Sequence, residues 1–377
     1  MVDATMFWSA EGGGGVRRYL FAKRAQLGAR RGWRHTIVAP NASGPGMVDC
    51  GGLPLPGSGG YRLPWRRAAA ARLIAAQAPD LVEAGDPYGL AWAALDAARS
   101  CRVPAVLFCH SDVPTLAADA LARWLHADRA SRWPRDVDRH VGRYLAHTCE
   151  GFDLVLAPSR TMQRRLHALG VRQALHQPLG VDTAVFTPAA RDERWRASLG
   201  LPPGTRLLLY VGRFAREKNL PQLVAAVERL GPRWRLLAMG QGPLPPRGTQ
   251  VLRLPFEADP ARVARALASV DGVVHAGDQE TFGLAVLEAM ACGTPVAVRN
   301  AAGLAEAVAG GCGVAVDSGR VDDWAQAIEA LVVAPRVQVE AGLARARAHD
   351  WAEVIALLQR RYERAIAGSA AGVMEPA

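Results

Sequence analysis

The sequence predicts an α/β protein built from two doubly wound, Rossmann-like domains that face each other across a cleft. Short apolar runs rich in β-branched residues alternate with segments of helical spacing along most of the chain, which is typical of parallel sheets covered by helices. A proline- and charge-rich stretch at residues 175–206 interrupts this alternation once. With 377 residues, the chain also exceeds one ordinary core. We therefore expect an N-terminal domain over residues 1–182 and a second domain over residues 183–350.

The N-terminal domain begins with the strand DATMFWS, a glycine-rich turn, an amphipathic helix and the strand HTIVAP. We expect the helix to turn Val16, Tyr19, Leu20 and Ala22 inward. Glycines at such a turn let backbone approach a phosphate closely, although GGGG differs from the G-x-G-x-x-G of dinucleotide-binding proteins. The elements expected next are a Gly/Pro-rich loop over 43–64, helices at 65–77, 88–99, within 114–150 and at 159–169, and strands at 80–84, 103–109 and FDLVLAPS.

The second domain begins with a strand at 206–212 and a helix at 219–230. A strand at 235–239, the glycine turn MGQGP and elements at 251–254, 262–268 and 270–276 follow. The segment DQETFGLAVLEAMACGTPVAVR (278–299) predicts a loop, a helix from Gly283 to Ala291 and a strand, with Gly293 where a helix C-terminal glycine belongs. A last helix is expected at 351–368, and we expect the segment 351–377 to pack back on the N-terminal domain.

Two glutamates flank the start of the helix that begins at Gly283. Glu280 lies in the loop at the carboxyl end of a strand, where ligands of open α/β sheets bind, and Glu288 lies about one turn into the helix. Backbone N–H groups at Phe282 to Leu284 suit a phosphate, whereas carboxylates accept hydrogen bonds from hydroxyls. A phosphate between two hydroxyl-rich groups describes a nucleotide sugar. The alternative is that Glu280 is a loop charge and Glu288 an exposed helix residue.

A basic pair follows the first strand of the second domain, in VGRFAREKN. The chain contains 43 arginines but only two lysines, Lys23 and Lys218, so lysine is avoided wherever either cation serves. Keeping Lys218 near Arg213 indicates a need for a compact ammonium group, as in point-charge recognition of phosphate. The alternative is a surface lysine present by chance.

These motifs together resemble the retaining family 4 glycosyltransferases of the GT-B fold. The resemblance rests on VGRFAREKN, the E-x7-E pair within FGLAVLEAMACGTPV, GGGGVRRYL, LGVDTAVFTP, MGQGP and HSDVP, and it covers most of the chain. Gln241 departs from the pattern, since an acidic residue often stands there. The resemblance implies a catalytic role for His110, Arg213, Lys218 and Glu280, and donor binding by Gly14, Gly15, Arg213, Lys218, Glu280, Phe282, Gly283, Leu284 and Glu288. Within these sets, Arg213 and Lys218 would hold the diphosphate, Glu280 the transferred sugar and Glu288 the ribose, and His110 would line the sugar and acceptor site.

The activity implied is transfer of a hexose from a UDP-, GDP- or ADP-sugar to an acceptor hydroxyl of a glycolipid, polysaccharide or small molecule. The anomeric configuration would be retained, and no cofactor or metal would be needed, because two cations neutralise the leaving diphosphate. Asp136-Val137-Asp138 matches a D-x-D metal motif but lies in a basic, helical stretch. The alternatives are a nucleotide-sugar-binding protein without turnover, or a phosphorylase or epimerase of the same architecture.

Composition bears on location and partners. The sequence has no apolar run of 18 residues, no basic signal-peptide start and six unpaired-looking cysteines, so a cytoplasmic protein is expected. Residues 1–182 carry 23 Lys+Arg against 15 Asp+Glu, without a nucleic-acid motif, so we expect no nucleic-acid partner. YRLPWRR (61–67) mixes cations with Trp65 and predicts a peripheral contact with an anionic membrane at its cytoplasmic face, and hence a lipid-linked acceptor. The alternative is that Trp65 packs in the core.

Overall fold

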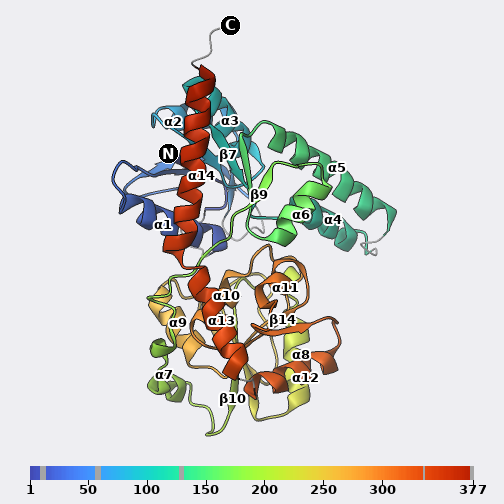
Figure 1. Cartoon of the computed structure of the whole chain (residues 1–377). Coiled ribbons are helices and arrows are strands. Elements are labelled where there is room, and N and C mark those ends of the chain that lie inside the picture. The colour runs from blue at the N-terminus through green and yellow to red at the C-terminus, as the bar shows by residue number, and fades with distance from the viewer. Residues whose placement is uncertain (9–13, 56–60, 127–130, 334–335, 374–377) are drawn as a thin grey trace. The chain divides into compact units, whose positions relative to one another are not determined.

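The computed structural model describes residues 1–8, 14–55, 61–126, 131–333 and 336–373 (Figure 1). The chain divides into two compact units. Unit 1 comprises Met1–Pro178 and Val354–Ala377, and unit 2 comprises Leu179–Glu353. The chain therefore returns to unit 1 within its last described helix, α14 (Trp351–Val373).

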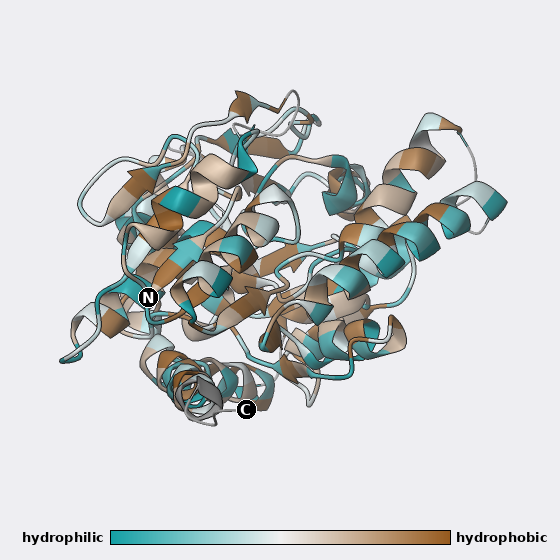
Figure 2. Ribbon diagram, turned by 90° about the horizontal axis from the view of Figure 1, so that it is seen from above, coloured by the Kyte–Doolittle hydropathy of each residue, from teal (hydrophilic) through white to brown (hydrophobic). Residues whose placement is uncertain are grey.

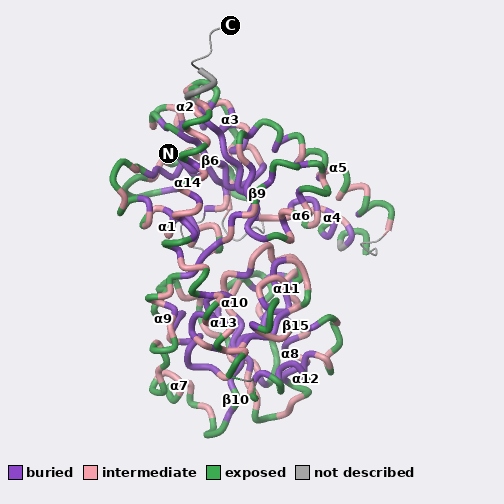
Figure 3. Tube along the Cα trace, in the orientation of Figure 1, coloured by how far each residue is buried: buried purple, intermediate pink, exposed green. Residues whose placement is uncertain are grey.

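Unit 1 is built on a seven-stranded parallel sheet with the strand order β3-β2-β1-β6-β7-β8-β9. The strands are β1 (Val2–Ala4), β2 (Thr36–Ala39), β3 (Met47–Asp49), β6 (Val82–Ala84), β7 (Ala105–Phe108), β8 (Leu154–Ala157) and β9 (Ala174–His176). Every residue of β1, β2, β6 and β7 is buried, as expected for strands covered on both faces (Figure 3). The apolar runs of the sequence therefore correspond to the centre of this sheet.

The helices of unit 1 follow the predicted order. They are α1 (Gly15–Gly28), α2 (Arg67–Ala75), α3 (Gly89–Cys101), α4 (Val113–Trp124), α5 (Arg132–Glu150) and α6 (Arg160–Ala168). The buried face of α1 consists of Tyr19, Leu20, Lys23 and Leu27, whereas Val16 and Ala22 are only half-buried. The prediction for this helix was thus wrong in one important respect, because its buried stripe includes a lysine.

The segment 43–64 is not simply a loop. It contains β3 and a short antiparallel hairpin formed by β4 (Leu53–Pro54) and β5 (Arg62–Leu63). The sequence also gave no sign of β9, which lies in the proline-rich stretch and pairs with β8. Strands of two or three residues are too short to display the two-residue alternation that identifies a strand.

Unit 2 is built on a six-stranded parallel sheet with the order β12-β11-β10-β13-β14-β15. The strands are β10 (Arg206–Val211), β11 (Trp234–Met239), β12 (Val251–Leu254), β13 (Gly272–His275), β14 (Val296–Arg299) and β15 (Val314–Val316). Its α-helices are α7 (Glu193–Ser198), α8 (Leu220–Leu230), α9 (Pro260–Ala268), α10 (Leu284–Ala291), α11 (Ala302–Val308), α12 (Val321–Val332) and α13 (Arg336–Ala348). For unit 1, Figure 2 shows hydrophobic residues mainly on the interior strands and hydrophilic residues on the outer parts of the helices.

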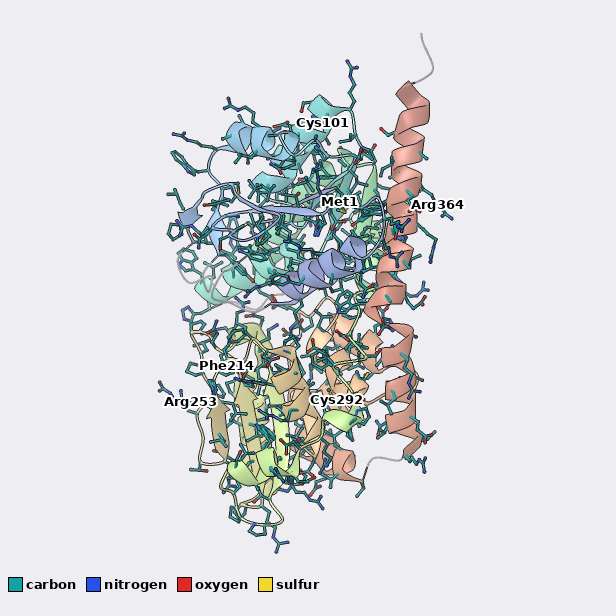
Figure 4. The ribbon with its side chains drawn as sticks, turned by 90° about the vertical axis from the view of Figure 1, so that its left-hand side faces the viewer. Met1, Cys101, Phe214, Arg253, Cys292 and Arg364 are labelled. Carbon is teal, nitrogen blue, oxygen red and sulfur yellow. The ribbon has the colours of Figure 1, made fainter. Side chains whose placement is uncertain are left out.

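The predicted end of α10 is confirmed. Gly293 has a φ of +70°, and its N–H donates to the carbonyl of Met290, so the helix ends in the left-handed conformation that favours glycine. At the other end of the chain, α14 buries Tyr362 completely in unit 1. Arg364 lies on its exposed side (Figure 4).

Candidate active site

Two glycine-containing loops of unit 2 pack against each other at the carboxyl ends of β10 and β11. A Cβ on Gly240 would lie 2.0 Å from the carbonyl oxygen of Gly212, and one on Gly242 would lie 2.4 Å from that of Phe214. The N–H of Phe214 donates to the carbonyl of Gln241 at 2.8 Å. The glycines of MGQGP are therefore needed for backbone-to-backbone packing, and Gln241 supports the loop through its main chain.

Arg213 lies in the supported loop. The hydroxyl of Tyr210 donates to the carbonyl of Arg213 at 2.8 Å, and burial raises the pKa of Tyr210 well above its usual value, so this donor keeps its proton. The Arg213 guanidinium donates to the Glu217 carboxylate at 2.6 Å and is about half exposed. The Tyr210 hydroxyl thus holds the backbone at Arg213. The guanidinium pairs with Glu217 but stays about half exposed, so it can still contact a ligand.

Lys218 meets Glu280, although the two are 62 residues apart in sequence. Lys218 ends a short 3₁₀ helix (Arg216–Lys218), and Asn219 follows with a φ of +50°. The side-chain amide of Asn219 donates to the carbonyl of Ala276 at 3.0 Å, which ties this loop to the end of β13. The Lys218 ammonium donates to Oε1 of Glu280, and both side chains are largely buried.

His275 completes this cluster, and the sequence analysis missed it. Its Nδ1 accepts a hydrogen bond from the N–H of Gly277 at 3.1 Å, so in the neutral ring the proton lies on Nε2. That nitrogen lies 3.4 Å from Oε1 of Glu280. Burial alone would raise the pKa of Glu280, but the charge of Lys218 and the hydrogen bond from His275 hold it well below its usual value. Glu280 is therefore ionised. The signal in the sequence that could have identified His275 was its position near the end of a predicted strand.

The start of α10 carries the other predicted residues. Gly283 precedes the helix with a φ of +90° and supplies no side-chain cap, so the first-turn N–H groups have no side-chain acceptor from the N-cap. The N–H of Gly303 donates to the Glu280 carbonyl at 2.7 Å and fixes the preceding loop. Leu284 begins the helix, and Phe282 is half-buried. Glu288 is only 3% exposed, so its interpretation as an exposed helix residue is wrong.

The remaining predicted residues lie in unit 1. His110 follows β7, is buried, and stacks on Phe108 with ring centroids 4.2 Å apart. Burial, with a smaller contribution from the charge of Lys23, lowers the pKa of His110 to about 3, so its ring is neutral at neutral pH. Gly14 precedes α1, and a Cβ there would only make ordinary contact with Tyr61, so packing within the chain does not require glycine at 14. Gly15 is exposed, and the other two glycines of the run lie outside the described residues.

Asp136 and Asp138 lie on α5, as expected for a helical stretch. Asp136 forms ion pairs with Arg139 at 3.2 Å and Arg132 at 3.7 Å, and Asp138 pairs with Arg165. In the part of the chain that the structure describes, no group of three or more His, Cys, Asp or Glu residues could hold a metal ion. The two carboxylates are thus engaged by arginines.

The two units, each built on a parallel Rossmann-like sheet, have the GT-B fold. The model of "Glycosyltransferase Family 4" matches residues 13–185, and that of "Glycosyl transferases group 1" matches residues 191–342. The chain belongs to the family 4 glycosyltransferases.

Its relatives include several bacterial mannosyl- and glycosyltransferases. A GDP-mannose-dependent alpha-(1-6)-phosphatidylinositol dimannoside mannosyltransferase of Mycobacterium tuberculosis is 29% identical over 294 residues, which are 74% of this chain and 72% of the relative. A D-inositol 3-phosphate glycosyltransferase of Pseudarthrobacter chlorophenolicus is 35% identical over 214 residues, covering 50% of each chain.

Solved structures share the fold. Sucrose-phosphate synthase of Thermosynechococcus elongatus has a TM-score of 0.77 at 21% identity, covering 97% of this chain and 99% of that one. The HepE protein of Anabaena in complex with UDP and glucose has a TM-score of 0.74 at 18% identity, covering 96% and 99%. Among the described residues, no helix is both long and apolar enough to cross a membrane.

Proposed function

We propose that this glycosyltransferase moves a hexose from a nucleoside diphosphate sugar to an acceptor hydroxyl with retention of configuration and without a metal. The observation that carries the proposal is the Lys218–Glu280 pair beside Arg213, at the carboxyl ends of β10 and β13. The ionised Glu280 accepts hydrogen bonds from sugar hydroxyls, and the neighbouring cations attract the diphosphate. The uncapped N-terminus of α10 adds N–H groups that favour phosphate. Glu288 would then bind the ribose.

The bond changes of the reaction assign a task to each group. The bond between the anomeric carbon and the phosphate oxygen breaks, and a bond to the acceptor oxygen forms on the same face. The acceptor's proton passes to the leaving phosphate oxygen. Negative charge on the diphosphate is the main quantity to stabilise, and Arg213 and Lys218 supply the opposite charge. Because Glu280 is held by Lys218 and His275, its role is to position the sugar rather than to attack it. The neutral ring of His110 can exchange hydrogen bonds with sugar or acceptor hydroxyls without adding charge.

The donor class is tested by thermal shift. We expect GDP-mannose to raise the unfolding midpoint more than UDP- or ADP-sugars, since two kinds of relative are described as GDP-mannose-dependent. A ligand at a hundred times its Kd stabilises the folded state by about 2.7 kcal/mol. An unchanged midpoint with all three donor classes would count against the proposed donor site.

Metal independence gives a second prediction. The two cations are proposed to replace a metal, so we expect full activity in excess EDTA. The rate of nucleoside diphosphate release is compared before and after chelation. Activity abolished by EDTA and restored by Mn²⁺ would contradict the proposal and favour metal binding at Asp136 and Asp138.

We further propose that the acceptor is a lipid or a lipid-linked glycan met at an anionic membrane surface. Trp65 is 62% exposed, with the Arg66 guanidinium 4.4 Å from its ring centroid, so the alternative of a core tryptophan is wrong. Leu53 and Leu63 on the neighbouring β4–β5 hairpin are also exposed. Arg67 is less available than the sequence suggested, because it forms two 2.6 Å hydrogen bonds to Asp96. The phosphatidylinositol dimannoside mannosyltransferase among the relatives supports a lipid acceptor.

Co-sedimentation with vesicles tests this surface. We expect binding to phosphatidylglycerol vesicles but not to phosphatidylcholine vesicles, weakening with added salt. The variant Trp65→Ala/Arg66→Ser should bind clearly less than the wild type, whereas Arg31→Ser, which changes an exposed arginine elsewhere in unit 1, should bind like the wild type. Equal recovery in the supernatant with both lipids would favour a water-soluble acceptor.

A further inference from the structure

Unit 1 contains a cavity of about 760 Å³ outside the residues assigned above. It lies among α4, α5 and α6, which are labelled in Figure 1. A volume of this size suits a small molecule rather than a few waters. The residues that line it are Asp112, Thr115, Ala118, Pro134, Arg135, Asp138, Arg139, Gly142, Arg143, Arg165, Ala168 and Leu169.

The charge of the lining is positive. Arg165 is engaged by both carboxylates of the cavity, at 3.3 Å from Asp112 and in a hydrogen bond to Asp138. Neither Asp112 nor Asp138 forms an ion pair with any of the other arginines that line the cavity, all of which the structure describes. Both acids of the lining therefore pair with the same arginine. The other three arginines have no carboxylate of the lining to neutralise them, so the lining carries a net positive charge.

Those three arginines, Arg135, Arg139 and Arg143, are spaced four residues apart on α5 and therefore share one face of the helix. Arg139 pairs with Asp136 at 3.2 Å. Arg135 and Arg143 form no ion pair with any residue that the structure describes. All three arginines are exposed and line the cavity, and like charges at this spacing repel one another, so an anion bound between them would relieve that repulsion.

We propose that this cavity binds a phosphate monoester or diester. A guanidinium donates two parallel hydrogen bonds to a phosphate, which is why arginine rather than lysine suits such a site. Asp112, which lines the cavity, lies two residues after His110, so the lining includes a residue of the loop that carries the histidine proposed to face the acceptor. The anion is accordingly assigned to the acceptor, and only this last assignment rests on the proposed function.

Two sources can supply such a phosphate: a free phosphorylated molecule or a lipid headgroup. The same pair of helices exposes Trp124 at the end of α4 and Trp133 at the start of α5, with fractional exposures of 76% and 64%. Because both sources present the same phosphate group, the experiment uses one probe for each of them.

Binding is measured on the full chain without any sugar donor, so a failure of the transfer chemistry does not affect the result. Titration calorimetry with glycerol 1-phosphate tests the free source, and flotation with phosphatidylglycerol against phosphatidylcholine vesicles tests the headgroup. We expect Arg135→Ser/Arg143→Ser to weaken the binding of glycerol 1-phosphate, of phosphatidylglycerol vesicles or of both about tenfold or more, because two charge-assisted contacts are lost. Arg31→Ser should leave both unchanged. Lys218→Ala should also leave both unchanged, which separates this cavity from the donor site.

The pattern of losses identifies the source. Loss of glycerol phosphate binding assigns the cavity to a free phosphorylated molecule, and loss of vesicle binding alone assigns it to a headgroup. The double variant should keep the wild-type circular dichroism and unfolding midpoint, because neither side chain has an ion-pair partner in the described chain. Wild-type affinity for both probes in this variant, or losses seen equally in Lys218→Ala, would overturn the proposal.

Discussion

Replacing Lys218 with alanine is expected to lower kcat/KM by about 10²-fold or more, because the leaving diphosphate loses a charge-assisted contact. The same change leaves Glu280, a largely buried carboxylate, without its ammonium partner. The loss should therefore appear in kcat as well as in KM. Arg213→Ala should act in the same direction, since its guanidinium lies in the same loop and is about half exposed.

The chain offers a matched control two residues away. Arg216 lies in the same 3₁₀ helix as Lys218 and is exposed, so Arg216→Ala should keep near wild-type kinetics. Lys218→Arg keeps the charge but not the compact ammonium, and it should recover only part of the activity. Near wild-type turnover by Lys218→Ala would remove the assignment of this residue to the diphosphate.

Replacing Lys23, the other lysine, with methionine is expected to destabilise the fold by about 3–5 kcal/mol, the usual cost of breaking a buried ion pair from one side. Its side chain is 0% exposed and donates to Asp3 and to Glu83, both at 2.8 Å. It also donates to the hydroxyls of Tyr19 and Tyr362, at 3.2 and 3.0 Å. Removing the ammonium would leave two carboxylates buried without their cation.

Urea unfolding at pH 8 measures this effect. Burial raises the pKa of Glu83 to about 7 even with Lys23 present, so at pH 8 the carboxylate is ionised and needs its partner. Adding Glu83→Gln to Lys23→Met should restore part of the lost stability, because one of the two uncompensated charges is then removed. A loss below about 1 kcal/mol for the single variant, the size typical of an exposed ion pair, would contradict this role.

Tyr362 gives the same cluster a consequence for the last helix. It lies on α14 and donates to Glu83, so the network joins the C-terminal helix to β6 and α1. Hydrogen exchange should therefore increase along α14 in Lys23→Met. This part of the fold depends on residues from four separate segments of the chain.

Composition singled out Lys218, and the structure shows its ammonium paired with Glu280 and largely buried; its role toward phosphate stays a prediction. The same scarcity of lysine applied to Lys23, but helical spacing directed attention to Val16 and Ala22 instead. A pattern of apolar residues cannot reveal a buried cation whose partners, Asp3, Glu83 and Tyr362, come from distant positions.

The strands and helices that the sequence predicted well lie within apolar stretches longer than the elements themselves, as β7 does. The elements it missed are short or polar. β4 and β5 have two residues each, and β9 lies in a proline-rich stretch. His275 was missed for a different reason, because its contact with Glu280 depends on how the loop after β13 folds back and not on spacing in the sequence.

Release of nucleoside diphosphate from GDP-mannose, with and without phosphatidylinositol vesicles as acceptor, tests the proposed transfer most directly. Transfer through a diphosphate held by Lys218 predicts release that rises with vesicles, persists in Arg216→Ala and falls about 10²-fold in Lys218→Ala. The GDP-, UDP- and ADP-sugars that raise the unfolding midpoint should be those that are consumed. Donors that bind but release no nucleoside diphosphate under any of these conditions would contradict the proposal and leave a nucleotide-sugar-binding protein without turnover.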